Sequence, residues 1–293
     1  MNQTIRDLLN DRPVILDGAW GTQMQAKGLP DGACPDEWNL SSPERVEEVA
    51  REYVEAGSQI IITNTFSSTR LCLEQNALAD KVREINVAGV EISKRAAGTE
   101  ARVFASMGPT GKSLFMGEVS PEQIAESYQE QADALASGGA DGIVVETMMD
   151  LKEAELAVQA AKSTGLPVVA CMTFGRGKNK DHTMMGVTVA EAVECFGKLG
   201  ADVIGSNCGQ GLEGMLKTCE VLKERTELPI WIKSNAGIPR LEGGETVYGT
   251  TAEQFVELAR PVVDAGADFI GGCCGTSPAY IELLSRAYKK SRC

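Results

Sequence analysis

The stretch that decides the fold is Ala265-Gly-Ala-Asp-Phe-Ile-Gly-Gly-Cys-Cys-Gly-Thr276. Its glycine at 266 is of the kind that ends a helix, and a short apolar run follows that stops at two cysteines. Leu199-Gly-Ala-Asp-Val-Ile-Gly-Ser-Asn-Cys-Gly209 has the same order. Glu55-Ala-Gly-Ser58 and Gly138-Gly-Ala-Asp141 lead into apolar runs in the same way. This repeat predicts helices that alternate with buried strands.

Eight short apolar runs fit the alternation. Most are β-branched on consecutive positions, as is typical of parallel strands covered on both faces. They are 13–16, 59–62, 102–105, 142–145, 167–170, 202–204, 229–232 and 268–270. Helical patterns separate them, for example at 42–56, 151–161 and 188–199. The sequence shows no linker between these elements, so the alternation predicts a single (β/α)8 TIM barrel over residues 1–293. A doubly wound open sheet is the alternative, but a glycine-rich dinucleotide loop is missing.

Composition narrows the class of protein. Hydrophobic residues make up 43% of the chain and charged residues 24%, which suits a large globular core. The net charge of −13 argues against nucleic acid and anionic membrane surfaces as partners. The sequence has neither an apolar run of roughly 18 residues nor a signal-peptide core at its N-terminus. Nine cysteines without a secreted-scaffold spacing indicate free thiols or metal ligands in a reducing compartment. We therefore expect a cytoplasmic protein.

The predicted strands end in side chains that can do chemistry, and in parallel barrels the active site lies at these C-terminal ends. In chain order the strand-end residues are Asp17, Asn64, Met107, Glu146, Thr173, Cys208, Asn235 and the pair Cys273–Cys274. Two carboxylates and three thiols at one end of the barrel indicate a site that holds a metal cation and an amine together.

The thiols of Cys208, Cys273 and Cys274 point to zinc. Three protein ligands with one open position make a catalytic zinc site. The chain's single histidine, His182, lies in a polar loop and is predicted to be solvated, so a histidine-based site is excluded. Four further cysteines lie in apolar contexts and are predicted to be inert; they are Cys72, Cys171, Cys195 and Cys219.

The carboxylates indicate the substrate. Either Asp17 or Glu146 alone could be an ion pair at the barrel mouth, but both beside a metal-bound thiolate suggest an ammonium group. The amides of Gly18 and Ala19 could receive the matching carboxylate, so a thiol-bearing amino acid is the predicted ligand. Lys233 could be the Schiff-base lysine of an aldolase, although pairing with an acidic neighbour is the preferred interpretation.

Seven motifs carry a family resemblance. They are Asp17-Gly-Ala-Trp-Gly-Thr22, Thr63-Asn-Thr-Phe66, Gly108-Pro-Thr110, Glu146-Thr147, Asn207-Cys208, Asn235-Ala-Gly237 and Gly271-Gly-Cys-Cys-Gly-Thr276. Together they resemble the homocysteine S-methyltransferase family over nearly the entire chain. The resemblance implies zinc on Cys208, Cys273 and Cys274, with homocysteine as methyl acceptor and methionine as product. It places the homocysteine amine on Asp17 and Glu146, and Asn235 belongs to the same predicted pocket.

The methyl donor is less defined. The segment Thr63-Asn-Thr-Phe-Ser-Ser-Thr69 is most similar to the N-terminal domain of cobalamin-dependent methionine synthase, where folate, cobalamin and activation modules follow the barrel. Fewer than twenty residues follow Thr276 here, so we expect those modules to be absent or on other polypeptides. Betaine–homocysteine methyltransferases have a tyrosine where this chain has Ser67. The expected donor is therefore a methyl-corrinoid or methylfolate carried by a separate protein or module.

Two alternatives remain open. The first is a small onium donor such as betaine or S-methylmethionine, which would need an aromatic cage. Its candidate members are Trp20, Trp38, Phe66, Phe115 and Tyr248. The second is a non-catalytic zinc- or thiol-binding barrel.

Two polar, glycine-rich loops at 175–183 and 237–248 are predicted to form a mobile rim suited to a docking protein.

Overall fold

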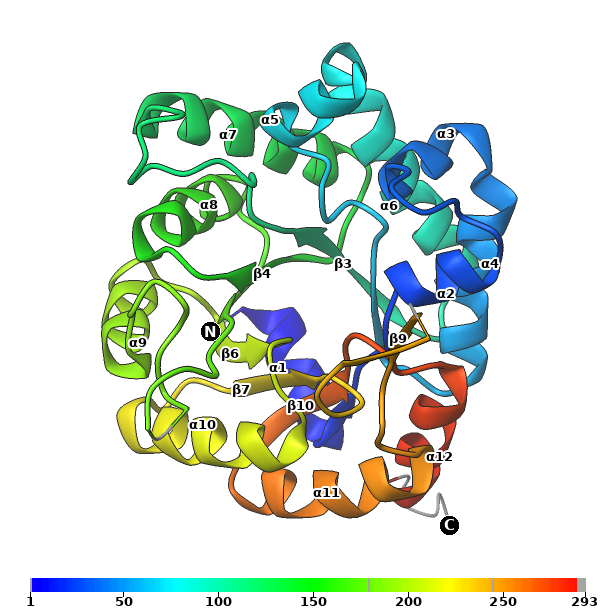
Figure 1. The fold of residues 1–293 in the computed structure, drawn as a ribbon, viewed down its shortest axis with the longest axis vertical. Helices are drawn as coiled ribbons and strands as arrows, with labels where there is room; N and C mark the ends of the chain where they lie inside the picture. The colour runs from blue at the N-terminus through cyan, green and yellow to red at the C-terminus, as the bar shows by residue number, and fades with distance from the viewer. Residues whose placement is uncertain (1, 179, 244, 289–293) are drawn as a thin grey trace.

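The computed structural model describes residues 2–178, 180–243 and 245–288 (Figure 1). Its main sheet has eight parallel strands in the order β1-β10-β7-β6-β5-β4-β3-β2. Their bounds are β1 Val14–Ile15, β2 Ile60–Ile62, β3 Arg102–Met107, β4 Gly142–Met148, β5 Val168–Met172, β6 Val203–Asn207, β7 Ile230–Ser234 and β10 Ala267–Gly272. Each strand overlaps the apolar run predicted for it.

The two edge strands of this sheet meet and close it. Leu16 forms a parallel bridge with Ile60, and the Gln59 N–H donates to the Ile15 carbonyl at 2.7 Å. The prediction of a (β/α)8 barrel is therefore confirmed, and the open-sheet alternative is wrong. Positions 1, 179, 244 and 289–293 of the predicted 1–293 domain lie outside the described residues.

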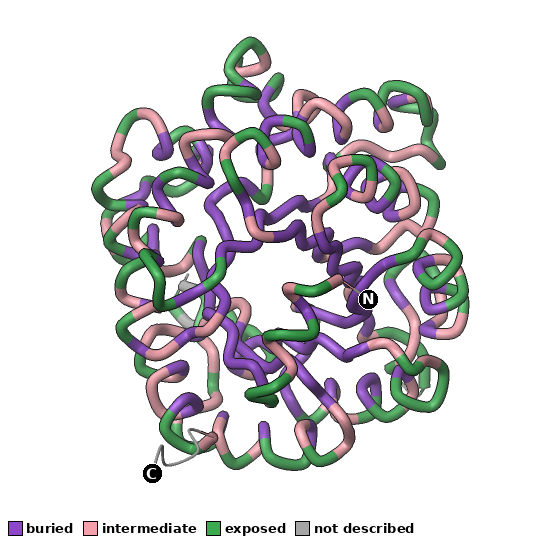
Figure 2. Tube along the Cα trace, turned by 180° about the vertical axis from the view of Figure 1, so that it is seen from behind, coloured by how far each residue is buried: buried purple, intermediate pink, exposed green. Residues whose placement is uncertain are grey.

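Helices surround the strands (Figure 1), and the most deeply buried chain forms the inner ring seen in Figure 2. The outer helices are α4 Pro43–Glu55, α6 Val82–Ala97, α7 Pro121–Ser137, α8 Leu151–Ser163, α9 Val189–Lys198, α10 Leu212–Arg225, α11 Ala252–Asp264 and α12 Pro278–Tyr288. Shorter helices are α1 Gln3–Leu8, α2 Gly21–Ala26, α3 Trp38–Ser41 and α5 Arg70–Leu73. Reciprocal capping boxes at Ser120, Thr188 and Thr251 begin three of the outer helices, because each hydroxyl satisfies a free N–H. No helix in the described ranges combines the length and apolarity needed to cross a membrane.

The four predicted helix-ending glycines adopt the left-handed backbone that such turns require. The φ angles of Gly57, Gly139, Gly200 and Gly266 are 97°, 89°, 73° and 111°. The residues that follow these turns then fasten the N-terminal end of the barrel.

At that end, side chains at the start of β2, β4, β6 and β10 accept hydrogen bonds from the backbone. The donors are N–H groups near the start of the neighbouring strands β1, β3, β5 and β7, respectively. The bonds are Ile15 N to Gln59 Oε1 at 2.9 Å, Val103 N to Asp141 Oδ2 at 2.8 Å, Val168 N to Asp202 Oδ2 at 3.1 Å and Ile230 N to Asp268 Oδ2 at 3.0 Å. The three aspartates also pair with cations, which are Lys94, Lys162 and Arg12 in the same order. We call these four bonds the strand-start clamps.

The barrel interior is filled below its C-terminal end by stacked aromatic side chains. The Trp231 ring lies 6.3 Å from that of Phe104 and 5.4 Å from that of Phe269, measured between centroids. Since side chains alternate along a strand, the residues two positions further on also point inward. These inward-pointing residues are Ser106 in β3 and Lys233 in β7. The aromatic layer therefore forms the floor of any site at the C-terminal end of the barrel.

The loop predicted at 237–248 contains more structure than expected. Arg240–Glu242 (β8) and Glu245–Val247 (β9) form a two-stranded antiparallel sheet, visible beside the β9 label in Figure 1. The loop at 175–183 is fastened by bridges of His182 to Arg176 and Thr188. Position 244 of the first loop and position 179 of the second lie outside the described residues.

Candidate active site

Three thiols converge at the C-terminal end of the barrel. The Sγ atoms of Cys208, after β6, and of Cys273 and Cys274, after β10, lie within 4.8 Å of one another. The Cys208 and Cys274 sulfurs are 3.9 Å apart. A tetrahedral zinc with Zn–S bonds of about 2.3 Å holds its sulfurs ~3.8 Å apart. The spacing therefore fits a zinc ion, and it is far too long for a disulfide.

Backbone bonds to β7 hold the thiols in place. The Cys208 N–H donates to the Lys233 carbonyl at 3.0 Å, and the Cys273 N–H donates to the Ser234 carbonyl at 2.7 Å. Cys208 has a φ of 59°, a left-handed conformation that costs a non-glycine residue about 1–3 kcal/mol. In this conformation the Cys208 sulfur lies with those of Cys273 and Cys274.

The three thiols do not ionise independently. Hydrogen bonds from Cys208 and then Cys273 lower the pKa of Cys274, and a smaller contribution comes from the Tyr248 hydroxyl. The pKa of Cys273 is raised well above its usual value by its hydrogen bonds to Cys208 and Cys274 and by burial. One thiolate is thus stabilised at the expense of its neighbours, and three thiolates require a cation. A soft, divalent metal such as zinc fits this donor set.

Asp17 lies in a buried ion pair beneath the thiols. Its Oδ1 accepts from Lys233 Nζ at 2.5 Å, and its Oδ2 accepts from Trp20 Nε1 and the Ile62 N–H, both at 2.8 Å. The Lys233 and Asp17 side chains are only 2% and 1% exposed. The predicted pairing of Lys233 with an acid is confirmed. Because Asp17 already has three protein donors, its contact with a substrate ammonium stays a prediction.

Glu146 is the second buried carboxylate. Its Oε1 accepts from Ser106 Oγ at 2.5 Å and its Oε2 from Asn207 Nδ2 at 3.2 Å. Burial raises the pKa of Glu146, and the charge of Lys233 opposes that rise. With both carboxylates ionised, Asp17, Glu146 and Lys233 form a buried cluster with one negative charge in excess. A second cation, such as a substrate ammonium, would neutralise it.

The state of Lys233 argues against the aldolase alternative. Burial alone would lower its pKa, but the charges of Asp17 and Glu146 outweigh burial and raise it. A Schiff-base lysine must lose its proton to attack a carbonyl. Lys233 therefore serves this site as a fixed cation.

The other predicted substrate residues flank the same space. The Ala19 N–H donates to Thr276 Oγ1 at 3.2 Å, and a Cβ on Gly18 would lie 2.8 Å from that hydroxyl oxygen. Asn235 is 4% exposed, and its side-chain oxygen has no hydrogen-bond partner within the described chain. An orphaned, buried acceptor is costly unless a ligand donates to it. The substrate roles of Gly18, Ala19 and Asn235 stay predictions.

Sequence reasoning gave no role to three residues that shape the site. Asn207 bonds twice to Thr147, through Oδ1 to the Thr147 N–H at 2.8 Å and through Nδ2 to the Thr147 hydroxyl at 2.7 Å. Thr147 has a φ of 62°, which is unusual for a β-branched residue. With Ser106, these residues orient Glu146. The position of Asn207 directly before Cys208 at a strand end was the available signal.

The remaining candidates are four cysteines, the histidine and the aromatic residues. Burial raises the pKa of each cysteine predicted to be inert, namely Cys72, Cys171, Cys195 and Cys219. His182 is 39% exposed and bonds to Asp181 at 2.7 Å. Within the described chain, Tyr248 is the one aromatic candidate that bonds to a thiol.

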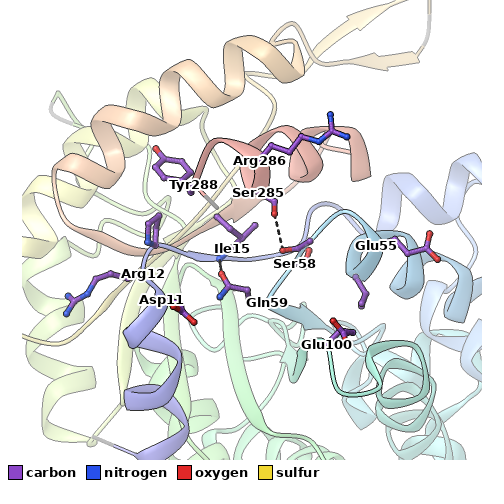
Figure 3. Close-up of a pocket in the computed structure, with 13 residues that line it drawn as sticks. Asp11, Arg12, Ile15, Glu55, Ser58, Gln59, Glu100, Ser285, Arg286 and Tyr288 are labelled. Carbon is purple, nitrogen blue, oxygen red and sulfur yellow. Dashed lines mark hydrogen bonds between the residues drawn. The ribbon is translucent and has the colours of Figure 1, made fainter. Parts of the chain in front are cut away.

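Two cavities lie at opposite ends of the barrel. The larger, of about 910 Å³, is at the N-terminal end (Figure 3), where Arg12, Gln59, Glu100 and Tyr288 line it. It faces the start of the strands, away from the thiols. The second, of about 530 Å³, is at the C-terminal end, where Thr173, Gly209 and Ile238 belong to its lining.

Comparison with known proteins agrees with this geometry. A sequence model of the family described as homocysteine S-methyltransferase matches residues 14–288. The chain belongs to the homocysteine S-methyltransferase family. The resemblance inferred from the motifs is therefore confirmed.

Relatives within the homocysteine S-methyltransferase family include two long proteins. Methionine synthase of Mycobacterium tuberculosis (strain ATCC 25618 / H37Rv) is 32% identical over 301 residues, which cover 96% of this chain and 25% of that protein. Methionine synthase of Mycobacterium leprae (strain TN) is 30% identical over 302 residues, with the same coverage. The chain thus spans about a quarter of the length of these relatives.

A solved structure gives the same fold. The metallated form of the homocysteine methyltransferase MmuM from Escherichia coli superposes with a TM-score of 0.81 at 23% identity, covering 97% of this chain and 99% of that one. Its apo form gives a TM-score of 0.75 at 24% identity. At this identity the likeness establishes the barrel fold alone.

Proposed function

We propose that this protein is a zinc-dependent homocysteine S-methyltransferase that forms methionine. The observation that supports it most is the pairing of three thiols, spaced for zinc, with a buried acidic cluster that has one negative charge in excess. The thiols would hold a metal that binds a substrate sulfur, and the cluster would hold the substrate amine. A reducing compartment such as the cytoplasm, which keeps the thiols free, is part of the proposal.

Separate residues of the chain would bind the metal and the substrate ammonium group. Zinc held by Cys208, Cys273 and Cys274 would lower the pKa of the homocysteine thiol, so that it is ionised at neutral pH. Glu146 and Asp17 orient the ammonium group. Ser106 and Asn207 hold Glu146 in turn.

The remaining contacts fix the substrate for transfer. The Gly18 amide would receive the substrate carboxylate, and so would the Ala19 amide in exchange for its 3.2 Å bond to Thr276 Oγ1. The side-chain oxygen of Asn235 would accept a substrate N–H. The thiol proton leaves to solvent as the acceptor binds. The sulfur then attacks the methyl carbon in line, so a sulfur–carbon bond forms while the carbon–donor bond breaks and its electron pair stays with the donor.

The barrel mouth favours a donor delivered by another protein or module. All the large apolar side chains that are exposed in the described chain follow barrel strands and therefore lie on the C-terminal face. They are Phe66, Phe115, Met116, Met184, Met185, Ile238, Leu241 and Val247. Exposed apolar side chains gathered on one face mark a surface that another protein covers. We infer that this partner carries a methyl-corrinoid or a methylfolate.

The aromatic residues give less support to a small onium donor. Trp20 already donates to Asp17 and is 8% exposed, while the guanidinium of Arg45 covers the Trp38 ring at 5.1 Å from its centroid. These faces are therefore not available for a cation–π cage. Within the described chain, Tyr248 is the candidate aromatic that bonds to a thiol.

The test combines metal analysis with a donor panel. The purified chain should contain one zinc and should form methionine from homocysteine and methylcobalamin or methyltetrahydrofolate. Betaine and S-methylmethionine are the comparison donors, and rapid turnover with either alone would reverse the donor preference. A protein that binds zinc but neither binds homocysteine nor forms methionine would instead be a non-catalytic zinc-binding barrel.

A further inference from the structure

Tyr248 lies directly after the β8–β9 hairpin, and its ring packs on the backbone next to one of the three thiols. The residue under the ring is Gly275, which follows Cys274. A Cβ added at Gly275 would overlap the tyrosine ring. Gly275 also has a φ of 82°, a conformation that favours glycine. A side chain at position 275 would therefore displace Tyr248 from its place beside the thiol.

Hydrogen bonds hold the chain after Tyr248 to the same cysteine. The Ala236 N–H donates to the Cys274 carbonyl at 3.0 Å, and the Thr250 N–H donates to the Ala236 carbonyl at 3.1 Å. From α12, the Tyr280 hydroxyl donates to the Thr250 carbonyl at 2.7 Å. The position of Tyr248 relative to Cys274 is thus fixed two residues away, independently of the exposed hairpin.

The hydroxyl of Tyr248 gives Cys274 a hydrogen bond of a different kind from those of the other two thiols. It bonds to the Cys274 sulfur, whereas Cys208 and Cys273 hydrogen-bond to the neighbouring thiols. All three cysteines are partly exposed at the barrel mouth. Tyr248 therefore distinguishes Cys274 among three sulfurs that an incoming reagent can reach.

This distinction matters because the proposed reaction needs one sulfur to be methylated and three to be spared. Homocysteine would bring a fourth thiolate beside the cysteine thiolates. Attack by a cysteine would form a sulfur–carbon bond while the carbon–donor bond breaks and its electron pair stays with the donor. The product is a neutral thioether, so the metal site would lose an anionic ligand. A hydrogen bond that stabilises a thiolate also lowers its nucleophilicity, because the sulfur lone pair is held by the donor.

We propose that the Tyr248 hydroxyl protects Cys274 from alkylation, so that the methyl group goes to the substrate sulfur. The inference rests on the proposed function and names a residue that discriminates between the metal ligands and the acceptor. Gly275 provides the room that the tyrosine ring needs. Tyr248 acts through the cysteine and is a positioning residue.

The experiment measures alkylation of each thiol by iodoacetamide in the zinc-loaded full chain, without homocysteine. In this reaction a sulfur–carbon bond forms, the carbon–iodine bond breaks and iodide leaves. Fragmentation mass spectrometry resolves Cys273 from Cys274, and zinc content is measured in every sample. The readout is the alkylation rate of Cys274 divided by that of Cys208 in the same molecule. A general loosening of the site changes both rates and leaves this ratio unchanged.

Tyr248→Phe keeps the ring and removes the hydroxyl. It should raise the ratio about tenfold, as expected for the loss of one hydrogen bond to a charged group. The matched control is Tyr288→Phe, which makes the same change at the N-terminal end of the barrel. The buried Tyr288 hydroxyl has no hydrogen-bond partner within the described chain, so the ratio should change less than twofold.

The outcomes keep this proposal separate from the proposed function. An unchanged ratio in Tyr248→Phe overturns the protective role, and so does equal acceleration at all three thiols, which would mark Tyr248 as a structural residue only. Methionine formation is assayed separately. A chain in which Tyr248→Phe raises the ratio but which never methylates homocysteine would refute the proposed function and leave the protection of Cys274 standing.

Discussion

Replacing Lys233 with methionine tests the buried charge cluster most directly. Methionine keeps most of the side-chain volume while removing the ammonium that lies 2.5 Å from Asp17. The variant leaves Asp17 and Glu146 buried together with no cation between them. We expect a large loss of stability and no loss of zinc, because Lys233 contacts Cys208 through its backbone carbonyl alone.

The structure sets the size of the effect. Removing one partner of a buried ion pair costs about 3–5 kcal/mol, since the remaining charge is left uncompensated. Asp17 keeps two donors, Trp20 Nε1 and the Ile62 N–H, so the loss should lie at the lower end, about 3 kcal/mol. For a chain of 293 residues this corresponds to a melting temperature lower by roughly 5 °C.

The pH dependence gives the prediction its sign. Lys233 has a raised folded pKa, so its stabilising contribution is complete below the unfolded lysine value and is lost only as pH rises through the folded pKa. Glu146 also has a raised folded pKa, so its protonation stabilises the folded state at low pH. Without Lys233 that pKa rises further. The destabilisation by Lys233→Met should therefore be smaller at pH 5 than at pH 8.

Urea unfolding of the wild type and of Lys233→Met at pH 5 and pH 8 measures the loss of stability. The control is Lys198→Met, whose partner Glu194 is exposed at the surface, so the variant should change the free energy of unfolding little at either pH. Adding Asp17→Asn to Lys233→Met should recover part of the loss. A Lys233→Met protein destabilised by less than about 1 kcal/mol, or equally at both pH values, would show that the cluster is not an interacting unit.

Three further outcomes are expected. Cys273→Ala should lose zinc by mass spectrometry while Cys171→Ala retains it, and full zinc occupancy in Cys273→Ala would remove the metal assignment. Glu146→Gln should bind homocysteine about 10–100-fold more weakly at unchanged zinc content, as for a lost charge-assisted hydrogen bond, and wild-type affinity would show a structural residue. Asp268→Asn at the far end of the barrel should cost about 1–3 kcal/mol in unfolding experiments while leaving zinc and homocysteine affinity unchanged, and altered zinc affinity would contradict that separation.

The sequence predicted the strands and the thiols well because both depend on local pattern. Each apolar run is bounded by a glycine turn, and the cysteines stand where two runs end. The partners of Lys233 were harder to name. They are set by register across the barrel, where Lys233 lies opposite Asn207 on one side and Gly271 on the other. No pattern within one strand records that alignment.

The backbone conformation at the site could not be predicted from the sequence either. The left-handed φ of Cys208 and of Thr147 runs against the preference of both residue types, and packing of the finished barrel maintains it. The β8–β9 hairpin was within reach, since Glu242-Gly-Gly-Glu245 places two glycines between short alternating runs. The prediction of a plain loop at 237–248 took no account of this signal.

The strand-start clamps give the molecule a fixed end and an adjustable end. Each clamp joins one odd strand to the even strand after it, so the barrel is assembled from four like quarters, each aligned by its own bond. The register between these strands is therefore fixed at the N-terminal end of the barrel, about the length of a strand away from the sulfurs. The loops of the mouth are free to lengthen, to hold strained residues such as Thr147, or to exchange one docking partner for another, without shifting how any two strands pair.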